Sequence, residues 1–168
     1  MKTTIILITV VLLTPAALPV PIFYQSASER LAQQVITALK KGSPEDYAAL
    51  FPTLGEFQAM MDQNSFVYGE YLSAAKEEFA VRYENEIMPS VKTSITSILQ
   101  EGNKKGIDWS QINFESAECN MPAKDFETVP FTIVFSVKGK EYRMTIDKAF
   151  IMHKIWKVSS EISLYSQR

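Results

Sequence analysis

Apolar and polar residues follow two different spacings along this chain. Up to about residue 101 the apolar residues recur at intervals of three, four and seven, which is the spacing of one helix face. From about residue 111 to residue 164 apolar and polar residues alternate, as in strands with one buried face. Because the helices precede the strands instead of alternating with them, the pattern predicts an α+β fold with helices packed on one face of an antiparallel sheet.

Capping residues divide the helical half into segments. Three predicted helix starts carry residues suited to the first turn: Ser26 with Glu29, Ser43 with Pro44, and Thr53 with Glu56. The first helix is expected to end at Gly42. The longest helical pattern covers residues 68–100, and Pro89 should kink or divide it because its ring obstructs the carbonyl four residues earlier. The prediction is therefore a group of N-terminal helices that includes one long kinked helix.

The second half predicts a curved, four-stranded antiparallel meander. A weak strand begins at residues 112–115, and residues 129–137 alternate clearly. A turn at residues 138–140 leads into a third strand, and a turn at His153 leads into a fourth strand that continues to Leu164. Residues 120–128 form the longest expected loop and join the first two strands.

The first residues of the chain predict a targeting segment. Lys2 precedes an apolar run over residues 5–13, the length of a signal-peptide core, and prolines at 15, 19 and 21 disfavour a straight transmembrane helix. Residues 1–28 are therefore expected to be a signal peptide, followed by one domain over residues 29–168 that is periplasmic or secreted. The alternative is a retained membrane anchor over residues 3–24, the one case in which a membrane contact is expected.

Composition and charge narrow the classes of partner. The 168 residues are 46% apolar and carry a net charge of −2, with basic and acidic residues intermixed. Such a distribution disfavours nucleic acid, whose binders cluster their Lys and Arg. Cys119 is the only cysteine, so no intramolecular disulfide and no thiolate zinc site can form.

Catalytic signals are absent from the sequence. Nucleophile-elbow and phosphate-loop motifs do not occur, and His153, the sole histidine, falls in a predicted turn. On the apolar face of the well-patterned strands Tyr142 is the only titratable residue. We therefore assign no catalytic residue, no metal site and no cofactor from the sequence.

Aromatic residues supply the candidate binding site. Tyrosines on the helices, with others on the sheet, could line a cavity in which an apolar ligand is held by a few hydroxyl groups. The candidate ligand-binding residues are Tyr71, Tyr83, Tyr142 and Trp156. Packing in the core is the competing interpretation of the same residues.

The predicted elements come in the order short helices, one long kinked helix and a four-stranded meander. The last strand of the meander follows a turn and contains Ile-Trp-Lys-Val at residues 155–158. This order resembles the cystatin-like cone domains of the nuclear-transport-factor-two-like superfamily, which includes ketosteroid isomerase, and in particular small exported bacterial members of unknown function. The resemblance covers about residues 29–164. It implies the fold; no residue set here matches the isomerase active site, so it implies no catalytic residues.

Three functions follow as hypotheses. The favoured one is an exported, non-catalytic domain that binds a small apolar ligand or a protein partner. The second is a small cofactor-free lyase or isomerase that uses Tyr142 with a helix-borne acid such as Glu70. The third is a component of envelope assembly that docks a partner through its outer helices or the loop at residues 120–128. The sequence sets no oligomeric state.

Overall fold

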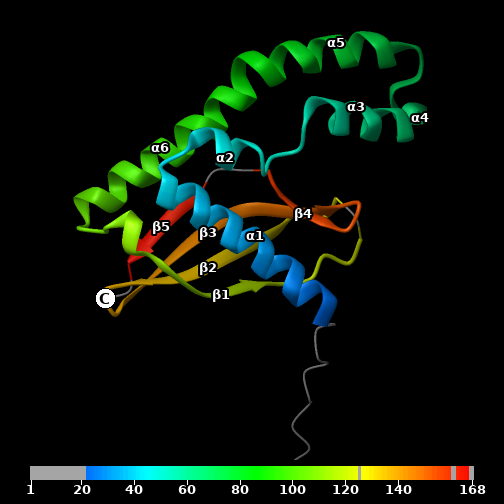
Figure 1. Cartoon of the computed structure of the whole chain (residues 1–168). Coiled ribbons are helices and arrows are strands. Elements are labelled where there is room, and N and C mark those ends of the chain that lie inside the picture. Colours follow the sequence, from blue (N-terminus) through cyan, green and yellow to red (C-terminus); the bar gives the residue numbers. More distant parts are fainter. Residues whose placement is uncertain (1–21, 125, 160–161, 167–168) are drawn as a thin grey trace, which may run out of the picture.

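The computed structural model describes residues 22–124, 126–159 and 162–166 (Figure 1). The predicted leader falls mostly on residues 1–21, outside the described residues, so its role in export or anchoring stays a prediction. Within the described part of the chain, no helix is both long and apolar enough to cross a membrane.

Helices make up the first two thirds of the described chain, as the spacing predicts. They are α1 (Ile22–Lys41), α2 (Pro44–Ala48), α3 (Leu54–Gln63), α4 (Ser65–Tyr68), η1 (Gly69–Tyr71), α5 (Leu72–Arg82), the π-helical turn η2 (Tyr83–Ile87), α6 (Met88–Lys104) and η3 (Trp109–Gln111).

Two of the three predicted helix caps are present. The Ser43 side chain accepts a hydrogen bond from the Asp46 N–H at the start of α2. Thr53 and Glu56 form a reciprocal capping box at α3. The third prediction was wrong in position, because α1 already begins at Ile22 and therefore contains Ser26. Its other end is as predicted, with Gly42 in the left-handed region at φ +61°.

The long helix is interrupted close to the predicted place. A π-helical turn over η2 joins α5 to α6, and Pro89 occupies the first turn of α6. Proline has no N–H to donate, and its ring obstructs the carbonyl of residue 85, so the preceding backbone widens into a π turn. The prediction of a kink at Pro89 is confirmed.

The sheet is an antiparallel meander in which two short strands, instead of one, pair with the third strand. The strands are β1 (Asn113–Cys119), β2 (Val129–Val137), β3 (Lys140–Met152), β4 (Ile155–Val158) and β5 (Ile162–Ser166). β1, β2, β3 and β4 are neighbours in that order, and β5 also pairs with β3. The sequence predicts one final strand up to Leu164; the structure divides it, with β4 beside the last residues of β3 and β5 beside the first.

A bulge in β3 accompanies this division. Val129 and Phe131 of β2 pair with Ala149 and Ile146, so β3 has one residue more than its partner over this stretch. A bulge bends the strand and increases its twist. The bend separates the part of β3 that holds β5 from the part that holds β4.

The core lies between the inner face of the sheet and helices α1 and α6. α1 crosses the sheet and contacts β1 and β4, while α6 packs on β5 (Figure 1). The inner-face residues predicted from alternation are all buried: Phe131, Ile133, Phe135, Tyr142, Met144, Ile146, Trp156, Val158 and Ile162. The α+β fold, with helices on a curved antiparallel meander in which β4 and β5 share the fourth position, is thus as predicted.

Helices α3, α4 and α5 form an arm that extends beyond the sheet (Figure 1). Phe57 contacts Phe79 and Tyr83 inside this arm, with ring centroids 5.0 and 6.1 Å away. At its base, the Lys157 ammonium of β4 lies 2.9 Å from the Glu56 carboxylate, which ties the arm to the sheet.

Candidate functional site

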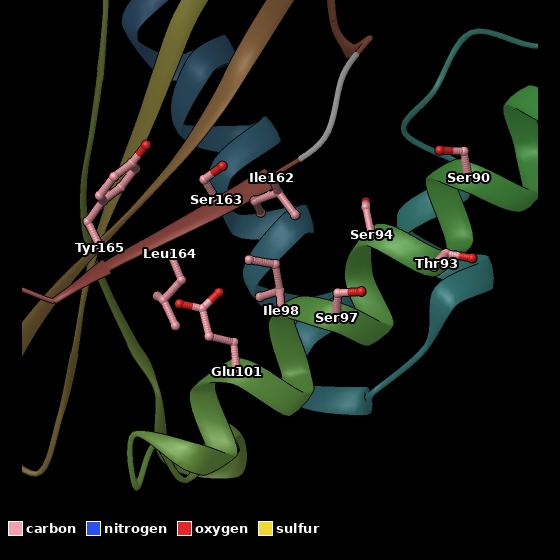
Figure 2. Close-up of a pocket in the computed structure, with 10 residues that line it drawn as sticks. All are labelled: Ser90, Thr93, Ser94, Ser97, Ile98, Glu101, Ile162, Ser163, Leu164 and Tyr165. Carbon is pink, nitrogen blue, oxygen red and sulfur yellow. The ribbon is translucent and has the colours of Figure 1, made fainter.

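A groove of about 280 Å³ lies between α6 and β5 (Figure 2). Its lining residues are Ser90, Thr93, Ser94, Ser97, Ile98 and Glu101 from α6, and Ile162, Ser163, Leu164 and Tyr165 from β5. A water molecule needs roughly 10–15 Å³ on this measure, so the groove has room for about twenty non-hydrogen atoms. That is about the size of a short peptide segment.

The helix side of the groove carries mainly hydroxyl groups. Its lining positions recur at intervals of three and four, so they share one face of α6, next to the face that buries Val91 and Ile95. Thr93 Oγ1 donates to the Pro89 carbonyl over 2.9 Å, and Ser94 Oγ donates to Val91 over 3.0 Å. Both oxygens therefore keep lone pairs that can accept a hydrogen bond from a ligand.

The turn between β2 and β3 determines which residues of β3 direct their N–H and C=O groups toward β2. Lys138 and Gly139 both have positive φ, 51° and 79°, which is the geometry of a two-residue type I′ hairpin. The flanking pair Val137 and Lys140 is then hydrogen-bonded, and bonded and non-bonded pairs alternate from there. It follows that Tyr142, Met144 and Ile146 direct their N–H and C=O groups toward β2.

The edge of β5 is consequently unpaired on its groove side. Ile162 and Leu164 lie opposite Ile146 and Met144, whose polar groups are already used by β2, so their own N–H and C=O groups point away from β3. The Lys105 ammonium confirms this direction, because it donates to the Leu164 carbonyl over 3.3 Å. Within the described residues no strand lies beyond this edge.

Charge is confined to one end of the groove. The Glu101 carboxylate is 2.6 Å from the Lys105 ammonium, so the two charges compensate each other there. Beneath the groove, burial raises the pKa of the Tyr47 phenol well above its ordinary value of 10, and the adjacent Ser94 hydroxyl opposes part of that shift. The Tyr47 hydroxyl is sealed from solvent without a well-formed hydrogen bond. It stays neutral and cannot serve as a base.

The structure does not bring the four predicted ligand-binding residues together. Tyr71 is 70% exposed on the arm, and the half-buried Tyr83 donates its hydroxyl to the Pro52 carbonyl over 2.8 Å. Tyr142 and Trp156 are both 4% exposed in the core. Tyr142 lies near the start of β3, whereas Trp156 of β4 lies opposite Ile151, nine residues further along β3. None of the four lines the groove.

The residues of the isomerase hypothesis are also separated. The Tyr142 ring stacks on Phe135 with centroids 5.5 Å apart, whereas Glu70 is exposed in η1, which packs on α4 and α5 of the arm. Cys119 is half-buried on β1, and burial raises the pKa of its thiol while Ser28 opposes the shift. Among the described residues, no three His, Cys, Asp or Glu side chains gather as a metal site would require.

The arm ends in an exposed apolar tip. Phe66 is 84% exposed, and Val67 and Tyr71 are exposed beside it in sequence. Exposed apolar residues that gather in one place are typical of contact surfaces. The tip is distinct from the groove, because α4 and η1 contact mainly neighbouring parts of the arm and contribute no residue to the groove lining.

Sequence reasoning missed the groove. The serine and threonine residues at 90, 93, 94 and 97 carry the signal, since their spacing is that of a helix face. Only the apolar residues of this helix were used to place it, so no prediction was made for its second, polar face. The unpaired edge of β5 depends on the pairing of strands far apart in the chain, and the sequence alone does not give it.

Comparisons with known proteins found few similarities to this chain. No protein-family model matches it, and no curated protein is significantly similar to it. A solved structure, that of a cystatin-like protein from Ruminococcus gnavus ATCC 29149, is similar with a TM-score of 0.48 and 12% sequence identity. The match covers 88% of this chain and 46% of the other, so the chain spans less than half the length of that protein. Membership of the wider superfamily named above stays a prediction.

Proposed function

We propose that this domain is a non-catalytic binding module whose groove takes an extended segment of a protein partner as an added strand on β5. The observation that carries the proposal is the outer backbone edge at Ile162 and Leu164, which pairs with no described strand and faces a row of hydroxyl groups. In strand addition, main-chain hydrogen bonds hold the peptide and alternate side chains give selectivity. Among the sequence hypotheses, this one develops the protein-partner form of the favoured function.

The shape of the groove limits the partner segment to a few residues. Ile162 and Leu164 are two residues apart, about 7 Å along the strand, so they offer hydrogen bonds to about three residues of an antiparallel peptide. The Leu164 carbonyl is held by Lys105 and would have to exchange that donor for a peptide N–H. With so few bonds over an open surface, we expect a dissociation constant on the order of micromolar or weaker.

The lining favours polar over apolar side chains on the bound segment. Side chains that point toward α6 would meet the Thr93 and Ser97 hydroxyls, and at one end the compensated pair of Glu101 and Lys105. A large apolar side chain there would cover hydroxyl groups without bonding them, which is unfavourable. We therefore propose a partner segment rich in Ser, Thr, Asn or Gln. A small apolar ligand is the less suited occupant of this groove.

The other two hypotheses have weaker support. An isomerase would need Tyr142 and Glu70 at one bound molecule, and the structure separates them as described above. An assembly role is favoured by the exposed tip at Phe66. If that role is the main one, Phe66→Ser should abolish partner binding and a block in the groove should leave it unchanged.

A block placed in the groove tests the proposal. Ser97→Trp places a large ring in the groove, whereas Thr96→Trp adds the same ring to the neighbouring, exposed position outside the groove lining. Both variants and the native domain are screened against a displayed library of random heptapeptides. We expect selected peptides to bind the native domain and the Thr96→Trp variant, and to lose binding to Ser97→Trp. Equal binding by all three proteins would contradict the proposal.

Amide hydrogen exchange tests the strand pairing directly. In the free domain the amides of Ser163 and Tyr165 should be protected, because they bond to β3, while those of Ile162 and Leu164 should exchange quickly. A selected peptide should protect Ile162 and Leu164. If these two amides are slow in the free domain, the edge is not available.

We further propose that this binding takes place outside the cytoplasm, on the basis of the predicted leader. Expression of the full chain followed by mass measurement in each cell fraction tests this. A soluble species shortened by about 15 to 28 residues is expected for a cleaved leader. A full-length cytoplasmic species would refute export without affecting the groove.

A further inference from the structure

A second, smaller pocket lies at the other end of the sheet, between the middle of α1 and the turn that joins β3 to β4. It is lined by Ala27, Arg30, Leu31 and Gln34 from α1 and by Lys154, Ile155 and Trp156 from the turn and β4. Its volume of about 50 Å³ corresponds to about four water molecules. That is the size of one small anionic group and too small for a peptide.

The pocket concentrates hydrogen-bond donors and positive charge. Arg30 and Lys154 both line it, and within the described ranges neither takes part in an ion pair or a side-chain hydrogen bond. Gln34 adds an amide, and no acidic side chain is among the lining residues. Two uncompensated cations beside one small hollow raise the local affinity for an anion.

A buried indole supplies an independent observation. Trp156 lines the pocket, is 4% exposed and packs on Phe131, with ring centroids 5.5 Å apart. Its Nε1–H is sealed from solvent and meets no acceptor among the described residues. An indole N–H is a donor only, and a buried donor without an acceptor is unfavourable. The Trp156 ring is therefore a wall of the pocket whose polar group the described residues leave unsatisfied.

The turn that carries Lys154 is held in an uncommon conformation. His153 and Lys154 have φ values of 49° and 66°, in the left-handed region that residues with a Cβ rarely adopt, and neither is Gly or Asn. The pairing of Met152 with Ile155 closes this two-residue turn. The result places the Lys154 side chain at the pocket beside Arg30 of α1.

We propose that this pocket is a binding site for a phosphate group, held by the Arg30 guanidinium and the Lys154 ammonium, with the Trp156 ring in its wall. Arginine binds phosphate through two parallel hydrogen bonds, and lysine adds a point charge. Because α1 continues from the predicted leader, the phosphate could belong to a lipid headgroup or to a free solute. The site is separate from the α6–β5 groove and does not depend on the function proposed for it.

Titration with inorganic phosphate, followed by NMR of the indole protons, tests the site. The chain has two tryptophans, and the Trp109 indole donates to the Leu99 carbonyl over 3.0 Å, so it serves as an internal reference. We expect millimolar phosphate to shift the Trp156 indole resonance and leave that of Trp109 in place. Chloride at equal ionic strength should shift neither. An unmoved Trp156 resonance would overturn the proposal.

Three charge variants separate the site from general electrostatics. Arg30→Gln and Lys154→Gln should each weaken phosphate binding by about tenfold, because each removes a charged partner. Lys40→Gln removes an exposed charge on the same helix, outside the pocket, and should change binding little. Equal weakening by all three variants would show that net charge alone attracts phosphate and would refute a built site.

Vesicles distinguish the two sources of phosphate. The full chain is mixed with phosphatidylcholine vesicles that contain or lack phosphatidic acid, whose headgroup is a phosphate monoester. Binding that needs phosphatidic acid and is lost in Arg30→Gln assigns the site to a lipid headgroup. Phosphate binding in solution without any difference between the two kinds of vesicle assigns it to a free solute.

Discussion

Replacing Gly102 by alanine gives the sharpest test of the packing between α6 and the sheet. Gly102 is buried within α6, where glycine is normally unfavourable and alanine would gain about 1 kcal/mol of helix propensity. Here an added Cβ would lie 2.6 Å from Trp109 Cε2, and closer still to Cζ2. Carbon atoms in contact are normally about 3.5–4.0 Å apart, so the Trp109 ring would have to move by about 1–2 Å.

That movement is opposed by the contacts of the Trp109 ring. Its Nε1–H bonds to the Leu99 carbonyl, and its plane stacks on Phe135 with centroids 6.1 Å apart. Losing the hydrogen bond costs about 1 kcal/mol, the aromatic contact about 1 kcal/mol, and overpacking about 2 kcal/mol. After the gain in propensity, Gly102→Ala should lower the free energy of unfolding by about 3 kcal/mol.

Urea unfolding followed by circular dichroism measures this change. Gly55→Ala is the matched control, because Gly55 lies in the first turn of α3 with nothing within 4 Å of the new Cβ, and the variant should be unchanged or stabilised by up to about 1 kcal/mol. Trp109→Leu should lower the free energy of unfolding less in the Gly102→Ala background than in the native domain. Gly102→Ala creates the overlap with the Trp109 ring, and Trp109→Leu removes it. A Gly102→Ala variant at least as stable as the native domain would refute the reasoning.

Three further predictions concern single side chains. Burial raises the pKa of Glu56, but hydrogen bonds from the Thr53 N–H and Lys157 outweigh burial, so the net effect lowers the pKa below the ordinary 4.5. The ionised Glu56 side chain therefore stabilises the fold above pH 4.5, and this stabilisation is lost as the pH falls through the lowered pKa. Glu56→Gln should lower the free energy of unfolding at pH 7 by about 1 kcal/mol and flatten its dependence on pH below 5, as acid and urea titrations would show. Burial raises the pKa of Cys119, so a chromogenic thiol reagent should react slowly with the native domain and quickly in urea, and equal rates would contradict that burial. Ser43→Ala removes the cap of α2 and should cost about 1 kcal/mol in thermal unfolding, with Ser43→Asn close to native.

Local signals were predicted well because they act between residues close in sequence. The Thr53 capping box, the end of α1 at Gly42 and the interruption before Pro89 each depend on a few neighbouring residues. The buried face of β2 and β3 follows from alternation, which requires only that one face of the sheet is covered. These features together define the α+β fold.

The start of α1 and the site could not be predicted in the same way. Ser26 and Glu29 match a capping box, yet the helical backbone continues back to Ile22, so a local match was overruled by a longer helix. The pairing of β5 with the first half of β3 depends on where β3 bends. The four candidate aromatics were grouped by chemistry alone, and side chains from the arm and from both ends of the sheet cannot converge.

The arm over α3, α4 and α5 makes few contacts with the strands of the sheet. Its aromatic cluster packs against the main core where Phe57 meets Phe51, with ring centroids 5.9 Å apart; the Glu56–Lys157 pair ties the arm to β4, and the Tyr83 hydroxyl bonds to Pro52 in the loop before α3. Segments with few contacts to the main core open at a lower free energy than global unfolding. The arm can therefore melt and re-form while the sheet remains intact, which makes it the part of the molecule best able to tolerate inserted or exchanged sequence.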